Sequence, residues 1–223
     1  MKVRPPLNRF PLALQRYILH FEASIEDAVR EFAASLPSGG RVLDAGAGEG
    51  QYAHHFLGRR YVGVDLGIGD STWSYSGLNA IADLIFLPFA EKTFDAALNV
   101  VTLEHVTDPF AVMDEIYRCL QPGGRLLLIT PMDWEEHQEP HDYFRYTSYG
   151  LKHLAARAGF VDVEVRAVGG IFRLLSRRLL SAGQMVPLLL PFFAPIALVL
   201  PMLDTLDRKR NFTLGHICYA RRP

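Results

Sequence analysis

Apolar and polar positions alternate along the chain with two periods, one typical of amphipathic helices and one of buried strands. Between residues 12 and 36, apolar side chains recur every three or four positions, which predicts a helix that ends at the Pro37–Gly40 turn. Helical patterns also cover 50–57, 109–120 and 149–158. Short apolar runs predict strands at 41–47, 61–66, 82–86, 94–101, 125–130, 161–168 and 216–220. This alternation predicts an α/β fold in which helices cover both faces of a parallel sheet.

Two segments depart from this pattern. Residues 133–147 are polar and aromatic without a helical or strand period, so we expect a long active-site loop. Residues 179–203 contain no charged side chain. We therefore divide the chain into an N-terminal helical extension, 1–38, and a main domain, 39–223, with an apolar helical insertion at about 171–210.

Composition narrows the function classes. Of the 223 residues, 49% are hydrophobic and 21% charged, which excludes a disordered tail protein. The formal net charge of −1 gives no support to a nucleic-acid partner, and we expect none. Cys119 and Cys218 give neither a disulfide framework nor a metal-ligand spacing, which suits a reducing compartment. Pro11, Gln15 and Arg16 interrupt the apolar stretch near the start, so we expect no signal peptide and a cytoplasmic location.

The strongest local signal is the glycine-rich turn within Val42–Gly50, after the first predicted strand. Glycines let a backbone approach a ligand closely, and the start of the following helix favours a negative group such as a carboxylate. Gln51 stands where a dinucleotide-binding fingerprint has a glycine. Asp44, at the carboxyl end of the strand, can receive a cationic ligand and would repel a pyrophosphate. A tight strand-to-helix turn without a ligand is the structural alternative.

The pattern D-x-G-x-G-x-G at 44–50 resembles the first motif of the class I S-adenosylmethionine-dependent methyltransferases. Further segments match this family in order. Residues 61–65 resemble its second motif and 82–84 its third, and the stretch 94–109 looks like the fourth strand and following loop of its type 11 subgroup. Leu-Gln-Pro-Gly-Gly-Arg-Leu-Leu-Leu at 120–128 is similar to the subgroup's entry to the fifth strand.

The resemblance implies a Rossmann-like, mostly parallel sheet of seven strands whose last strand is antiparallel. It also implies S-adenosylmethionine as cofactor, released as S-adenosylhomocysteine. The acid that ends the second motif, Asp65, takes the ribose hydroxyls in the family, which suits a carboxylate. The segment 67–80 is short where the family has a helix, and Asp70 within it is an alternative ribose acid. The implied cofactor-binding residues are Asp44, Gly46, Ala47, Gly48, Asp65, Leu66, Asp83, Leu84 and Asn99.

Candidates for the chemistry lie in the loops after the strands, where α/β sheets bind ligands. Methyl transfer from a sulfonium depends mostly on positioning, and a base is needed only when the acceptor loses a proton. His105 is a candidate base, or else it orders its loop through hydrogen bonds. In the long loop, the candidates for the lining of the acceptor pocket are His141, Asp142, Tyr143, Arg145 and Tyr146, with His141 as a second base. The alternative is a packed surface loop tied by an Asp142–Arg145 pair.

Two other chemistries are disfavoured. His137 and His141 with nearby carboxylates could bind a metal, but Pro140 opposes a helix that would hold both, and we expect no metal. Asn99-Val-Val-Thr stands where an Asn/Asp-Pro-Pro-Tyr motif would indicate nitrogen methylation. Its absence disfavours a DNA base or a protein amide as the methyl acceptor.

The apolar segment 184–203 is long enough to be considered for a bilayer span. Its four prolines oppose a straight helix, and the basic flanks 173–178 and 208–210 both favour the cytoplasmic side. The last predicted strand also requires the chain to return to the sheet. We therefore expect a membrane-surface or re-entrant element that contacts anionic lipid through 185–203. The alternative is a buried helical cover, either a lid or a homodimer interface.

These features together predict an enzyme that transfers a methyl group to an oxygen of an amphipathic or lipid-linked small molecule. We expect it in the cytoplasm, associated with the cytoplasmic face of a membrane. One alternative is a methyltransferase of a soluble small metabolite, with the apolar segment as dimer interface or lid. Another is a non-catalytic sensor or scaffold that binds S-adenosylmethionine.

Overall fold

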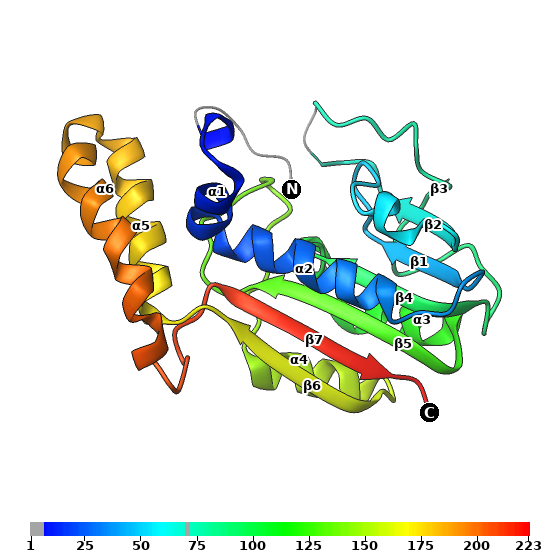
Figure 1. Cartoon of the computed structure of the whole chain (residues 1–223). Coiled ribbons are helices and arrows are strands. Elements are labelled where there is room, and N and C mark those ends of the chain that lie inside the picture. The colour runs from blue at the N-terminus through cyan, green and yellow to red at the C-terminus, as the bar shows by residue number, and fades with distance from the viewer. Residues whose placement is uncertain (1–6, 70–71) are drawn as a thin grey trace.

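A seven-stranded sheet forms the centre of the molecule (Figure 1). The structure is a computed structural model that describes residues 7–69 and 72–223. Its strands lie in the order β3-β2-β1-β4-β5-β7-β6. Strand β7 pairs antiparallel with both of its neighbours, and the other neighbouring strands are parallel. This arrangement confirms the expected Rossmann-like fold with an antiparallel last strand.

The central strands are buried on both faces, which explains their continuous apolar runs. Burial falls towards the β6 edge, where buried-side and solvent-side positions alternate. The strands are β1 (Arg41–Ala45), β2 (Arg60–Asp65), β3 (Ala80–Ile81), β4 (Phe94–Val100), β5 (Leu120–Pro131), β6 (Val161–Val168) and β7 (Gly215–Arg221).

One face of the sheet is covered by the N-terminal part of the chain. The single helix predicted over 12–36 is two helices, α1 (Leu12–Ile18) and α2 (His20–Ala34), which follow a short 3-10 turn, η1 (Leu7–Arg9). The helical spacing of Phe21, Ile25, Val29 and Phe32 buries one side of α2 against the sheet, where the helix contacts β5, β6 and β7. Helix α2 therefore forms part of the helical layer that covers this face of the sheet.

The opposite face carries α3 (Pro109–Cys119) and α4 (Ser148–Arg157) (Figure 1). Helix α3 begins where the Asp108 carboxylate accepts from the backbone N–H of Ala111, with Pro109 in the first turn. Helix α4 begins where the Thr147 hydroxyl accepts from the N–H of Gly150. Helices thus cover both faces of the sheet, as the sequence predicted.

Two predicted elements are wrong. The helix expected at 50–57 is only a 3-10 turn, η2 (Ala53–Phe56), because Gly50 and Gly58 both adopt left-handed φ angles, +73° and +80°, and bound it. The strand expected at 82–86 is absent, and the chain pairs with β2 only at Ala80–Ile81. It then turns at Asp83, whose carboxylate accepts from the N–H of Ile85.

The insertion between β6 and β7 is a helical hairpin that projects from the sheet (Figure 1). One arm is α5 (Ile171–Met185), and the other is a run of η4 (Pro187–Leu189), α6 (Leu190–Val199) and η5 (Leu200–Leu206). Asp204 and Asp207 close its base, since their carboxylates accept from backbone N–H groups at the start of α5. The helical elements between β6 and β7 thus span residues 171–206.

The two arms contact closely in spite of the prolines. Gly183 gives room for Leu190, because a Cβ at Gly183 would lie 2.8 Å from a Leu190 methyl carbon. Pro201 cannot donate to the carbonyl of Ala197, and the Ser176 hydroxyl donates to that carbonyl instead, at 2.6 Å. By length and composition, Pro187–Leu206 could cross a membrane. However, both ends of the hairpin join the sheet, and the other arm carries three arginines, so a single crossing does not fit this topology.

Candidate active site

A cavity of about 360 Å³ lies at the carboxyl ends of β1, β2 and β4. This is the edge at which parallel α/β sheets bind their ligands. It is lined by the loops that follow these three strands, together with α2 and the long loop 133–147. Most of the expected cofactor-binding residues line this cavity, namely Gly46, Ala47, Gly48, Asp65, Leu66, Asp83 and Leu84.

Gly46 brings the loops after β1 and β4 into contact. Its φ is +90°, and a Cβ there would lie 2.2 Å from the Thr102 methyl carbon. The Thr102 hydroxyl lies 3.1 Å from the Gly46 carbonyl and 3.1 Å from that of Val100. Next to it, the β-branched Val101 adopts φ +52°, a strained conformation typical of functional sites. A side chain at position 46 would therefore force these cavity walls apart.

Asp65 lies at the end of β2 with its carboxylate at the cavity wall. One carboxylate oxygen accepts from the Gly48 N–H and the other from the Gly67 N–H, both at 2.9 Å. These bonds fix the carboxylate while leaving each oxygen a further lone pair for a hydroxyl donor. The alternative ribose acid, Asp70, lies outside the described residues.

Asp44 and Asn99 lie beneath the cavity instead of lining it. Asp44 is 1% exposed and accepts from the Tyr61 hydroxyl at 2.5 Å. Burial raises the pKa of its carboxyl to about 7. Asn99 is fully buried, and its amide donates to the Ala45 carbonyl at 2.7 Å. Contrary to our expectation of direct cofactor contact, both residues brace the strand ends that carry the glycine loop.

Several lining residues were not found by sequence reasoning. Phe21, Glu22, Ile25 and Glu26 come from α2, which the sequence marked only as an amphipathic helix. Trp73 comes from the segment that replaces the family's helix, and its ring lies 3.3 Å from the position of a Cβ at Gly48. An aromatic residue in an otherwise Gly- and Ser-rich stretch was the available signal for Trp73, whereas α2 offered none.

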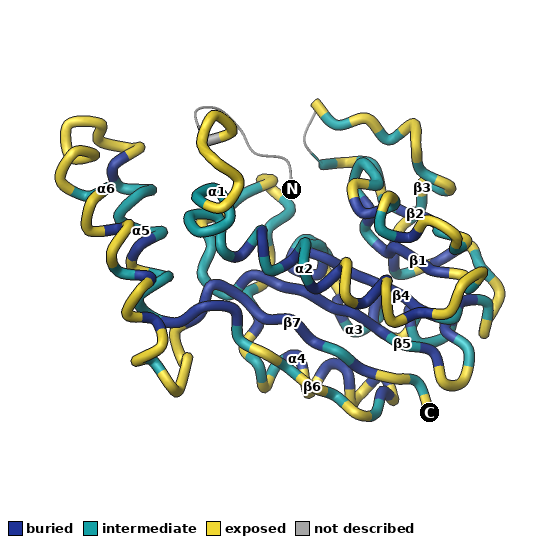
Figure 2. The backbone as a smooth tube through the Cα atoms, in the orientation of Figure 1, coloured by how far each residue is buried: buried dark blue, intermediate teal, exposed yellow. Residues whose placement is uncertain are grey.

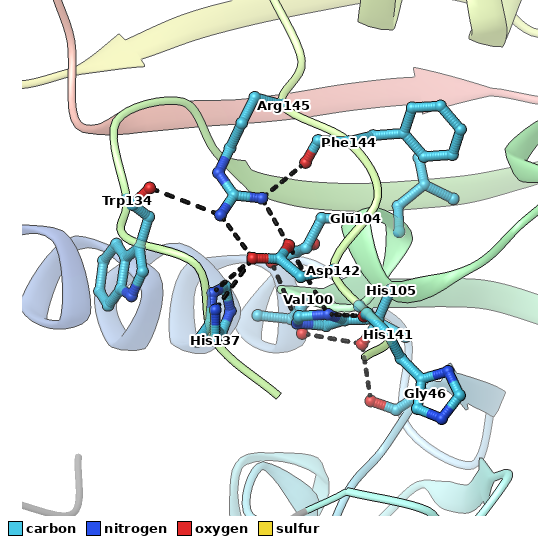
Figure 3. Close-up of polar contacts among 12 residues, drawn as sticks. Gly46, Val100, Glu104, His105, Trp134, His137, His141, Asp142, Phe144 and Arg145 are labelled. Atoms are coloured by element: carbon cyan, nitrogen blue, oxygen red, sulfur yellow. Dashed lines mark hydrogen bonds and ion pairs between the residues drawn. The ribbon is translucent and has the colours of Figure 1, made fainter. Parts of the chain in front are cut away.

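The loop 133–147 is held together by Asp142 (Figure 3). Its carboxylate binds both terminal nitrogens of Arg145, at 2.6 and 2.7 Å, and accepts from the His137 N–H at 3.0 Å. The Arg145 guanidinium lowers the pKa of Asp142 to about 2. Arg145 also donates to the carbonyls of Glu135 and Phe144. Its guanidinium is thus occupied within the loop, so the structure corrects its expected place in the acceptor pocket.

Tyr143 also lies outside the cavity lining, and its side chain is 42% exposed. Its hydroxyl lies 3.1 Å from Nδ1 of His141. His141 itself lines the cavity, as expected for an acceptor-facing residue. Tyr143 therefore orients the histidine from outside, which differs from the direct acceptor contact that we expected.

His105 both orders the loop and faces the cavity. Its Nδ1 lies 2.6 Å from the His141 carbonyl, which must accept, so Nδ1 carries the proton and Nε2 keeps its lone pair in the neutral ring (Figure 3). Burial lowers the pKa of the imidazole, which favours this neutral form. The two interpretations of His105 from the sequence are therefore compatible, one for each ring nitrogen.

The comparisons with known proteins agree with this architecture. The profile of a family described as "Methyltransferase domain" matches residues 17–165. A tRNA (carboxymethyluridine(34)-5-O)-methyltransferase from Arabidopsis thaliana is 32% identical over 50% of this chain and 28% of its own. A malonyl-[acyl-carrier protein] O-methyltransferase from Yersinia pestis is 30% identical over 40% of this chain and 36% of its own. The matches thus span less than half of these relatives' own length.

Solved structures share the fold at low identity. Phosphoethanolamine N-methyltransferase 2 from Haemonchus contortus, in complex with S-adenosyl-L-methionine, has a TM-score of 0.59 at 20% identity. It covers 90% of this chain and 52% of that one. The [4+2]-cyclase SpnF has the same TM-score at 22% identity, over 90% of this chain and 81% of its own. The fold therefore hosts a reaction other than methyl transfer, and on its own it does not define the chemistry.

The family profile covers about two thirds of the chain, and its range includes the glycine loop 44–50 and Asp65. The protein belongs to the methyltransferase-domain family and has the fold of the class I S-adenosylmethionine-dependent methyltransferases. The described residues fit S-adenosylmethionine. The loop Gly46–Gly48 lines the cavity, Asp65 offers a fixed carboxylate for the ribose hydroxyls, and Leu66 and Leu84 offer apolar walls for the adenine.

Proposed function

We propose that this protein transfers the methyl group of S-adenosylmethionine to an oxygen of an amphipathic or lipid-linked small molecule at the cytoplasmic face of a membrane. The cofactor, when bound, supplies an electrophilic methyl group on a sulfonium. His105 and His141 line the cavity and are the candidates to hold or remove an acceptor proton. The observation that carries the choice of acceptor is an exposed apolar hairpin linked directly to the cavity wall.

The tip of the hairpin, where α5 ends at Met185, and its second arm, formed by η4, α6 and η5, are exposed along much of their length (Figure 2). Met185, Leu188, Phe192 and Met202 have exposed fractions of 84%, 80%, 68% and 71%. Such a continuous apolar surface is unusual on a soluble domain and typical of an interaction site. Transfer of a side chain of this kind out of water contributes about 1.5–3 kcal/mol. A few of them suffice for stable docking on an acyl-chain surface.

Basic residues at the end of the apolar surface favour a membrane with anionic headgroups. Arg208, Lys209 and Arg210 follow η5 after Asp207, and all three are exposed. Each basic residue near an anionic leaflet contributes about 1 kcal/mol. If the hairpin lies flat, its apolar face enters the headgroup boundary while this basic end meets anionic headgroups. This arrangement supports the cytoplasmic leaflet as the docking surface.

The base of the hairpin is linked to the cavity by arginine contacts. The Arg177 guanidinium lies 3.7 Å from the centre of the Trp134 ring, which lines the cavity, and 3.1 Å from the Glu22 carboxylate of α2. Arg178 binds the Asp133 carboxylate at 2.8 Å. No residue of 171–206 lines the cavity, so the hairpin does not form a lid over it in the described structure. Docking would instead place the cavity loop close to the membrane.

The acceptor class is tested with methyl-labelled S-adenosylmethionine, the purified protein and a host-cell extract separated into organic and aqueous phases. Label in the organic phase is the expected result. Label confined to the aqueous phase would refute the lipid-like acceptor and leave a methyltransferase of a soluble metabolite. Absence of transfer together with measurable cofactor binding would favour a non-catalytic sensor or scaffold.

The docking surface is tested by co-sedimentation with vesicles that contain phosphatidylserine, at low salt. Phe192→Ser should reduce the bound fraction, whereas the matched variant Phe86→Ser should not. Phe86 is 76% exposed and lies in the turn after β3, away from the hairpin. Equal binding of both variants, or no binding by the wild type, would refute docking. A concentration-dependent dimer that Phe192→Ser abolishes would assign the surface to a second copy of the chain.

A further inference from the structure

Glu104 is a buried carboxyl next to His105, a residue of the cavity wall. It is 0% exposed, and neither of its carboxylate oxygens has a hydrogen-bond partner within residues 7–69 and 72–223. Burial of an unpartnered carboxyl costs several kcal/mol, so such a group needs a partner that compensates for this cost. Its backbone does have one role, since the Glu104 carbonyl accepts from the N–H of Tyr143. The backbone contact explains the position of the loop, but it does not explain why a carboxylate side chain is buried there.

A ring nitrogen of His105 without a hydrogen-bond partner lies near the Glu104 carboxylate, and His137 lies next to both. His105 Nε2 lies 3.8 Å from a Glu104 carboxylate oxygen and has no hydrogen-bond partner among the described residues. The ring centres of His105 and His137 are 4.6 Å apart. One ligand atom from each of Glu104, His105 and His137 lies within 4.8 Å of the others. The three side chains therefore converge (Figure 3).

The Nδ1 atom of each histidine lies close to an acceptor. His105 Nδ1 lies 2.6 Å from the His141 carbonyl, and His137 Nδ1 lies 3.0 Å from the Glu135 carbonyl and 3.3 Å from an Asp142 carboxylate oxygen. A metal-binding histidine in proteins almost always donates its second ring N–H to a carbonyl or carboxylate in this way. Both rings are therefore fixed in the tautomer that leaves Nε2 free for a cation.

We propose that Glu104, His105 and His137 form a site for one divalent transition-metal cation of the zinc class at the wall of the cavity. Two imidazoles and one carboxylate are a ligand set that zinc uses when it keeps an open position for a water or substrate oxygen. The ligand atoms must approach each other by about 1 Å or slightly more to reach Zn–ligand distances of about 2.0–2.2 Å. Side-chain rotation supplies this movement.

The position of the site gives it a role. His105 and His137 line the cavity, so the coordination positions that the protein leaves open face the space available for the methyl acceptor. A hydroxyl or carboxylate oxygen of the acceptor is the ligand that such a position takes. The proposal of a cation site depends only on the positions of these three side chains. Its use in orienting an acceptor rests on the proposed methyl transfer.

The sequence offered a different pair. His137 and His141 were weighed as metal ligands, but His141 contributes its backbone carbonyl to His105 and its ring to Tyr143. The expectation of no metal rested on Pro140 and on helical spacing, and the proposed ligands come instead from two separate loops. The segment between the loops, including α3 and β5, brings them together.

The test measures metal binding without cofactor or acceptor. The full chain, stripped with a chelator, is titrated with Zn²⁺ by calorimetry, with Mg²⁺ as the second probe. We expect one Zn²⁺ per chain, and at least about tenfold weaker binding in Glu104→Gln and in His137→Gln. Circular dichroism and Tm confirm that each variant folds. Because neither donor nor acceptor is present, the result does not depend on the proposed methyl transfer.

A matched control addresses adventitious binding. Glu26, His54 and His55 also place ligand atoms within 4.8 Å of one another, but His55 Nε2 already lies 2.7 Å from the Glu26 carboxylate. His54→Gln should leave Zn²⁺ binding unchanged. No Zn²⁺ binding by the wild type, full binding by Glu104→Gln, loss only in His54→Gln, or a preference for Mg²⁺ would each overturn the proposal.

Discussion

Substitution of Gly46 by alanine should be costly for two separable reasons. The residue adopts φ +90°, and a non-glycine residue in a left-handed conformation costs about 1–2 kcal/mol. The new Cβ would also lie 2.2 Å from the Thr102 methyl carbon and 2.5 Å from its hydroxyl oxygen. Overpacking of this kind costs about 1–3 kcal/mol. We expect Gly46→Ala to lose about 2–5 kcal/mol of the free energy of unfolding, a large part of the usual total.

The two costs are separated by a control in the same loop. Gly50 adopts φ +73°, and no described atom lies within 4 Å of the position of its Cβ. Gly50→Ala should therefore lose only the backbone part, about 1–2 kcal/mol. Urea unfolding measures both losses as shifts of the midpoint at constant slope. Calorimetric titration with S-adenosylmethionine should show weaker binding by Gly46→Ala, because the loops after β1 and β4 are forced apart.

A double-mutant cycle locates the clash. Thr102→Ala alone removes a hydroxyl that lies 3.1 Å from each of two carbonyls and should cost about 1 kcal/mol. In the Thr102→Ala background, Gly46→Ala should cost about 1–3 kcal/mol less than in the wild type, because two of the three closest atoms are gone. Equal costs in both backgrounds, or equal costs of Gly46→Ala and Gly50→Ala, would refute the contact as the origin of the loss.

Three further predictions concern carboxylates. Asp65→Asn should weaken S-adenosylmethionine binding roughly tenfold, because a charged acceptor for the ribose is lost, and unchanged affinity in calorimetry would contradict this role. Asp142 has its pKa lowered from 3.8 to about 2, so its contribution to stability is present above about pH 4 and is lost as pH falls towards 2. Arg145→Met should flatten the stability profile in that range, and an unaltered acid slope in chemical unfolding would count against it. Asp44 has its pKa raised from 3.8 to about 7 by burial, so the folded state retains a proton that the unfolded state loses. Wild-type stability should therefore decline between about pH 4 and 7, and Asp44→Asn should remove this decline.

Local sequence was sufficient for the elements that depend on short-range signals. The continuous apolar runs of β1, β4 and β5 predict buried parallel strands, and the period of α2 predicts its buried side. The glycine spacing at 46–50 correctly predicted the turn after β1 that lines the cavity. The turn needs left-handed φ angles, and glycine is the residue that adopts them readily. The segment 50–57, predicted wrongly as a helix, is bounded by glycines with left-handed φ angles, and 82–86, predicted wrongly as a strand, turns at Asp83. An apolar pattern encodes neither feature.

The candidate site shows the limit of sequence reasoning more clearly. The sequence identified Asp142 and Arg145 as a pair, but it did not decide whether Arg145 faced the acceptor or the loop. Only the fold shows that backbone carbonyls and Asp142 occupy its guanidinium. In the same way, the convergence of Glu104 with His137 needs two loops that a helix and a strand separate in the chain.

By itself, the sequence determined the α/β class, the family and the place of the glycine loop, because each of these depends on periods and motifs within short stretches of the chain. The tertiary structure alone decided that Asp44 is buried beneath the cavity, that α2 forms one of its walls, and that the hairpin presents its apolar side to solvent. Burial and contact across the sheet are properties of residues far apart in sequence, and a linear pattern does not specify which of them meet.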